Sequence, residues 1–123
     1  MNNKQKTIFL DIDGTLFQHK GTLDRMMTEE PIVLDGVVEQ LVKWRREGHY
    51  IVLTTARAEG TRSVTESQLL NNGVFFDQLI MGLTTGRRIL INDIKPDGMT
   101  TASAYSIVRD GGISHIDIYE DDR

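Results

Sequence analysis

Three short apolar runs, each followed at once by polar or acidic residues, constrain the fold of this chain more than any other feature. They cover residues 7–10, 50–53 and 89–91. Runs of this length without alternation are typical of strands buried on both faces of a parallel sheet. The residues that follow them are Asp11-Ile12-Asp13, Thr54-Thr55 and Asn92-Asp93.

The segments between these runs indicate helices, so that strands and helices alternate along the chain. One helix is expected over residues 36–47, capped by Asp35 and ended by Gly48. A second is expected to begin at Thr61 or Ser63. Further strands are predicted at 77–81 and 104–108, with an ambiguous tail at 116–119, whereas residues 14–34 lack clean periodicity and are expected to form a long functional loop. Alternation of this kind predicts an α/β fold with a mostly parallel sheet covered on both faces.

Composition excludes several classes of protein. The 123 residues, 39% hydrophobic and 26% charged, fit one folded domain spanning 1–123. A net charge of -4 argues against a protein that coats nucleic acid, and the lack of cysteine rules out disulfides and thiolate sites. No apolar stretch approaches the roughly 18 residues needed to cross a bilayer, and the start lacks a signal-peptide core. A cytoplasmic location without membrane contact is therefore expected.

The polar strand ends are expected to converge at one edge of the sheet, where ligands bind in such folds. Asp11 and Asp13 are two apart, and paired carboxylates favour a divalent cation such as Mg²⁺, to which Asp93 can add an oxygen. A carboxylate can also attack phosphorus, and a second one can exchange protons with the leaving group and with water. A hydroxyl, with Thr55 as the candidate, and a basic residue near Asp93 would hold the phosphoryl oxygens.

These segments resemble the signatures of the haloacid dehalogenase superfamily. Asp11-Ile12-Asp13-Gly14-Thr15 behind an apolar run is similar to the first signature. Leu53-Thr54-Thr55-Ala56-Arg57 is similar to the second, and Ile91-Asn92-Asp93 to the fourth. They occur in the family's order and together span most of the chain. The resemblance implies a three-layer, Rossmann-like α/β/α sandwich with a minimal cap or none.

The resemblance also implies roles for individual residues. Asp11 is the expected nucleophile and a metal ligand, Asp13 the acid and base and a ligand through its backbone carbonyl, and Asp93 the Mg²⁺ anchor. Thr55 is expected to hold the phosphoryl group. The third signature, a basic residue, is assigned to Arg88, with Arg87 and Lys95 as alternatives. The fourth signature departs from the family in having Asn92 where an acidic residue is common.

Residues beside these signatures are the candidates for substrate binding. They are Gly14, Thr54, Ala56 and Arg57. Gly14 is also suited to a tight turn. The gap after Asp13 is too short for a cap domain, so an open site is expected, or one covered by a neighbouring subunit of a homo-oligomer.

The leading functional prediction is a Mg²⁺-dependent phosphatase that forms an aspartyl-phosphate on Asp11 and acts on a small phosphorylated metabolite such as a sugar phosphate. Removal of 3′-phosphates from nucleic-acid ends is an alternative, and it requires that Arg57, Arg62, Arg87 and Arg88 form one basic groove. A response-regulator receiver domain is disfavoured, because Thr54-Thr55 follows the strand that should end in a phosphoacceptor aspartate. A silent relative that only binds a phosphorylated ligand is disfavoured by the intact Asp11 and Asp13.

Overall fold

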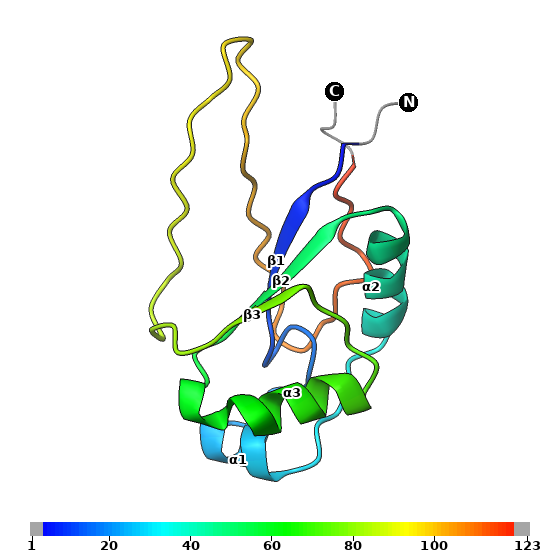
Figure 1. Cartoon of the computed structure of the whole chain (residues 1–123), viewed down its shortest axis with the longest axis vertical. Coiled ribbons are helices and arrows are strands. Elements are labelled where there is room, and N and C mark those ends of the chain that lie inside the picture. Colours follow the sequence, from blue (N-terminus) through cyan, green and yellow to red (C-terminus); the bar gives the residue numbers. More distant parts are fainter. Residues whose placement is uncertain (1–3, 120–123) are drawn as a thin grey trace.

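A parallel three-stranded sheet forms the centre of the structure, which is a computed structural model that describes residues 4–119 (Figure 1). The strand order is β1-β2-β3, and both pairings are parallel. The α/β architecture with a parallel sheet is thus confirmed. In chain order the elements are β1 (Thr7–Asp11), α1 (Leu23–Thr28), α2 (Val37–Arg46), β2 (Tyr50–Thr54), η1 (Glu59–Thr61), α3 (Arg62–Asn71) and β3 (Gln78–Ile80).

The central strand β2 is covered on both faces. Ile51, Val52 and Leu53 are all buried, and successive residues of a strand point to opposite faces. Trp44 of α2 belongs to the same core cluster as Ile51 and Leu53. A continuous apolar run therefore indicated this strand correctly, since alternation would have signalled a face open to water.

The start of α2 differs from the prediction. Its N-cap is Gly36, with a φ of 80°, and no side chain caps the helix. The prediction that Asp35 caps it is therefore wrong. Gly36 adopts a left-handed conformation that other residues rarely take and lies against the side chain of Ser114, so the chain turns into the helix by backbone geometry.

Helix α1 lies in the stretch that was expected to be a loop. Thr22 caps it, its Oγ1 accepting a hydrogen bond from the backbone N–H of Arg25 at 3.2 Å. Of its six residues only Met26 is buried. A helix of this length has too few turns to show a periodic apolar face, which explains why the sequence did not reveal it.

The strands predicted at 89–91 and 104–108 are wrong. Both lie in a long, extended excursion, here called the arm (residues 84–107), which projects from the body of the protein (Figure 1). Ile89, Leu90 and Ile91 are 71%, 61% and 87% exposed. Only residues 81–88 separate β3 from the apolar run, whereas a crossover to another parallel strand needs about a dozen residues or more. The chain therefore cannot easily return the run to the sheet in the parallel direction.

Candidate active site

Asp11 occupies the carboxyl end of β1, at the edge of the sheet where the other polar strand ends were expected. Its register partner on β2 is Thr54. The guanidinium Nη2 of Arg88 lies 3.8 Å from Asp11 Oδ1, and both side chains are 46% exposed. The structure therefore brings together the expected nucleophile and the basic residue assigned to the third signature.

The environment of Asp11 moves its pKa upward. Partial burial disfavours the charged form and raises the pKa of this carboxyl, and the nearby Asp13 adds to that effect. A hydrogen bond from the backbone of Ile12, the positive charge of Arg88 and the electrostatic effect of His19 lower this pKa. The carboxylate is thus partly desolvated yet faced by a cation, an arrangement suited to a nucleophile that receives an anionic group.

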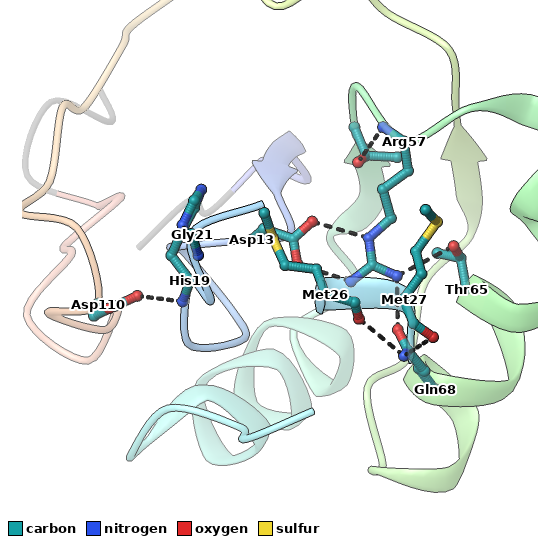
Figure 2. Close-up of polar contacts among 10 residues, drawn as sticks. Asp13, His19, Gly21, Met26, Met27, Arg57, Thr65, Gln68 and Asp110 are labelled. Carbon is teal, nitrogen blue, oxygen red and sulfur yellow. Dashed lines mark hydrogen bonds and ion pairs between the residues drawn. The ribbon is translucent and has the colours of Figure 1, made fainter. Parts of the chain in front are cut away.

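Asp13 is held by a buried arginine (Figure 2). Arg57 Nε donates to Asp13 Oδ2 at 2.9 Å, and Nη2 donates to Oδ1 at 2.8 Å. Arg57 Nη1 donates to Thr65 Oγ1 at 3.2 Å and to Gln68 Oε1 at 2.6 Å, both on α3. Gln68 in turn donates to the carbonyl oxygen of Met26 in α1 at 3.1 Å. This chain of contacts links the loop after β1 to α3 and α1.

Arg57 was expected to bind substrate, and the structure gives its side chain a structural role; its contact with substrate stays a prediction. Its side chain is fully buried, and each of its three guanidinium nitrogens donates to a protein oxygen. The sequence did contain a signal for this role. Thr65 and Gln68 are three apart on one face of a helix, and polar residues on an inward face indicate a buried partner.

The two threonines after β2 occupy different environments. Thr54 lies beside Asp11 in the sheet, and its Oγ1 donates to the carbonyl oxygen of Leu10 at 3.4 Å. Thr55 is 2% exposed, and its Oγ1 accepts a hydrogen bond from the backbone N–H of Arg57 at 3.0 Å. Ala56, between them and Arg57, is partly exposed. The expected contacts of these residues with a phosphoryl group stay predictions.

Gly14 makes the tight turn that was expected after Asp13. Its φ is 88°, and its N–H donates to the carbonyl oxygen of Phe17 at 2.7 Å. The carbonyl oxygen of Gly14 accepts from the N–H of Asp110 at 2.8 Å, and Asp110 Oδ1 accepts from the N–H of His19 at 2.8 Å. The segment around Asp110 is therefore held against the loop that carries Asp13 and Gly14.

Arg109 and Asp110 were not among the residues singled out from the sequence. Arg109 is exposed, and its side chain lies next to Gly14, 3.3 Å from the point where a Cβ would stand. Asp110 adopts a positive φ of 65°, in a turn that continues into Gly111 and Gly112. Asp110-Gly111-Gly112 is a sequence typical of a turn, but no local pattern links it to a loop so far away in the chain.

Replacing Gly14 with alanine is expected to lower the free energy of unfolding by about 1–2 kcal/mol, because a side chain disfavours the left-handed conformation. Urea unfolding of both proteins would measure this change. Gly60 provides the control, since no φ in the left-handed range and no atom within 4 Å opposes a Cβ there. An unchanged midpoint for Gly14→Ala would contradict the strained turn.

Asp93 does not join Asp11 and Asp13. It lies near the far end of the arm, where its carbonyl oxygen accepts from Thr101 Oγ1 at 2.9 Å. Within residues 4–119, no group of three or more histidine or acidic side chains is placed to hold a metal ion. Both carboxylate oxygens of Asp13 are also occupied by Arg57. The described residues of one copy therefore do not form the expected Mg²⁺ site, because the chain carries Asp93 away from Asp11.

The described part of the chain contains no helix long and apolar enough to cross a membrane.

No protein-family model and no curated protein matches the sequence. Solved structures do match. Two structures of a Pnkp1/Rnl/Hen1 complex, one described as an RNA repair complex, match with 24% identity and TM-scores of 0.57 and 0.56. The match covers 68% of this chain but only 30% and 28% of those chains.

A second match is a target protein from Vibrio cholerae, with 21% identity, a TM-score of 0.51, and coverage of 76% of this chain and 85% of that one. A D,D-heptose 1,7-bisphosphate phosphatase from B. bronchiseptica, complexed with magnesium and phosphate, matches with 19% identity over 63% of this chain and 49% of that one. Its TM-score is 0.46. The matches with TM-scores above 0.5 show that this chain shares its α/β fold with those proteins.

Proposed function

We propose that this protein is a phosphomonoester hydrolase that uses Asp11 as its nucleophile. The observation that carries the proposal is the pairing of Asp11 with Arg88 at the carboxyl end of β1. A partly desolvated carboxylate faced by a cation can attack phosphorus while the cation offsets the charge on the phosphoryl oxygens. The fold and the signature around Asp11 and Asp13 support the same chemistry.

The proposed reaction has two steps. An Asp11 oxygen attacks the phosphorus, the bond from phosphorus to the ester oxygen breaks, and the leaving oxygen takes a proton from Asp13. A water molecule then attacks the aspartyl-phosphate, giving its proton to Asp13. The bond between phosphorus and Asp11 breaks, so that inorganic phosphate leaves and the carboxylate is restored.

Asp13 must change its contacts to take part. Arg57 occupies both of its carboxylate oxygens in this structure. Proton transfer therefore requires the Asp13 side chain to turn from Arg57 towards the substrate. Catalytic contacts often tighten only when the substrate is bound, so this geometry is compatible with the role.

Mg²⁺ is the cofactor we propose, on the chemistry of the two carboxylates and on the resemblance of the sequence to its superfamily. Asp11 offers a carboxylate oxygen and Asp13 a backbone carbonyl, both of which are ligands that Mg²⁺ accepts. The expected third ligand, Asp93, lies on the arm and does not join them among the described residues of one copy.

We propose a small phosphorylated metabolite, such as a sugar phosphate, as the substrate. The alternative, a nucleic-acid end, required four arginines in one groove. Arg57 is fully buried, and Arg62 pairs with Glu59 at 2.5 Å and with Glu66 at 3.3 Å. Arg57 is therefore unavailable to a polyanion and the charge of Arg62 is partly offset by two glutamates, which favours the small substrate. The likeness to a protein of an RNA repair complex is the observation that keeps the alternative open.

Phosphate release from a panel of substrates tests the proposal. The panel contains sugar phosphates, nucleotides, 3′-phosphorylated oligonucleotides and an aryl phosphate, each with Mg²⁺ and with a chelator. We expect Mg²⁺-dependent release that is highest for a sugar phosphate. Preference for the oligonucleotides, with salt-sensitive binding, would favour the alternative. No release from any substrate by the folded protein would contradict a phosphatase.

Arg88→Ala is expected to lower kcat/KM by about 10²–10³-fold, the usual loss when a donor to developing charge is removed. The matched control is Arg87→Ala, because Arg87 is the adjacent exposed arginine on the arm. Steady-state kinetics on the best substrate of the panel would compare the two. A larger loss for Arg87→Ala would transfer the third-signature role to that residue.

A further inference from the structure

The arm exposes an apolar run that has the sequence of a buried strand. Ile89, Leu90, Ile91 and Ile94 are 61–87% exposed. Within residues 4–119, the backbone groups of residues 89–91 take part in no hydrogen bond. Four large apolar side chains beside unpaired strand-forming backbone are an aggregation hazard unless another strand covers them.

The strand that could cover them is also present. β1 pairs with β2 alone in the described sheet, so its other edge is free. Phe9, in the middle of β1, is 57% exposed. The free edge of β1 and the unpaired backbone of residues 89–91 each offer the hydrogen-bonding groups that the other lacks.

Within one copy, the arm cannot pair with the free edge of β1 in the parallel direction that would bring Asp93 to Asp11. It begins beside Asp11, as the 3.8 Å contact with Arg88 shows, and runs towards the end of the sheet where β1 begins (Figure 1). Residues 89–91 therefore run opposite to β1, and Asp93 moves away from Asp11. A second copy related by a two-fold axis perpendicular to β1 has its own β1 reversed. Residues 89–91 of the first copy then run parallel to β1 of the second copy. They end beside Asp11 and Asp13 of that second copy.

We propose that the arms of two copies are exchanged, so that residues 88–92 of each chain pair with β1 of the other and Asp93 completes the partner's active site. This inference rests on the proposed function for its catalytic part only. In the register that places Asn92 opposite Asp11, Leu90 faces Phe9, and Ile89 and Ile91 face Ile8 and Leu10. Asp93 then lies just beyond the strand end, as the third acidic oxygen donor that one copy lacks.

The area involved is sufficient for a stable dimer. At roughly 60–120 Å² for each aliphatic side chain, the six from residues 89–91 of two arms, with two Phe9 rings, bury on the order of 1,000 Å². Pairing of the backbones and the surface covered on the accepting sheets add to this, which brings the total into the range of specific interfaces. A reciprocal exchange is also a closed, isologous arrangement that leaves neither edge free.

Complementation between two inactive variants tests the exchange. Asp11→Asn and Asp93→Asn are co-expressed with different tags, and the mixed dimer is isolated by purification on both tags. With exchanged arms, one of its two sites has both aspartates, so we expect about half the wild-type turnover per dimer. If each arm served its own copy, neither site would be complete and the mixed dimer would be inactive, which would overturn the proposal. Full activity of the Asp93→Asn homodimer would also overturn it.

A cross-link tests the pairing of the arm with β1 independently of activity. Failure of the arm exchange can then be distinguished from failure of the proposed phosphatase function. The chain has no cysteine, and Phe9→Cys in one copy with Leu90→Cys in the other gives a unique pair. We expect a short bis-maleimide to join the two chains, and light scattering to give twice the 13.9 kDa of one chain. The control replaces Leu90→Cys by Val64→Cys, an exposed position on α3. A monomer by light scattering, or equal cross-linking of the control, would overturn the exchange whether or not the protein is a phosphatase.

Discussion

Asp11→Asn is expected to remove phosphatase activity, with kcat reduced by roughly four orders of magnitude or more, as is usual when the nucleophile of a catalytic unit is removed. The amide has nearly the same shape but cannot act as an anionic nucleophile. The carboxylate is 46% exposed and pairs with Arg88 across the surface, so little stability should be lost. Initial rates of phosphate release would measure the loss.

The matched control for this variant is Asp24→Asn, at an exposed position in the first turn of α1. Its turnover should equal that of the wild type. Thermal unfolding of both variants establishes that each is folded. Substantial turnover by a folded Asp11→Asn protein would assign the nucleophile to another residue.

Arg57→Met is expected to lower the free energy of unfolding by about 3–5 kcal/mol, the range seen when one partner of a buried ion pair is removed. Methionine fills much of the same space but leaves the Asp13 carboxylate, which is 9% exposed, without its two hydrogen bonds. Thr65 and Gln68 lose a donor as well. Urea unfolding would measure the change.

Arg62→Met is the control for a surface arginine. Arg62 pairs with Glu59 and Glu66 on the surface, where ion pairs contribute little to stability, so a much smaller loss is expected than for Arg57→Met. The double variant Arg57→Met with Asp13→Asn should be more stable than Arg57→Met alone, because the buried charge is also removed. A loss below about 1 kcal/mol for Arg57→Met would contradict a structural role for this arginine.

The elements predicted correctly are those whose signal is local. Helix α2 was expected over 36–47 and spans Val37–Arg46, since its apolar side and the Gly48 stop lie within one window. β3 was expected over 77–81 and spans Gln78–Ile80, and its signal also lies within one short stretch of sequence. The first signature also placed Asp11 correctly at the end of β1, because a strand end followed by a glycine turn is a short-range pattern.

What the sequence did not reveal depends on contacts between distant segments. The run at 89–91 has the composition of a strand, but strand formation requires a partner, and the residues after β3 are too few to return it to the sheet in parallel. Arg57 was expected to bind substrate, and its burial was not foreseen because its partners lie on another helix and on the loop after β1. Pairing and burial are properties of the fold, and local composition specifies them weakly.

The measurement that tests the central claim most directly is detection of the covalent intermediate. The protein is mixed with its best substrate, quenched in acid within milliseconds, digested and analysed by mass spectrometry. We predict that the peptide containing Asp11 gains the mass of one phosphoryl group, and that the same peptide from Asp11→Asn does not. Phosphate release without a phosphorylated peptide, or a phosphoryl group on a different residue, would contradict nucleophilic catalysis by Asp11.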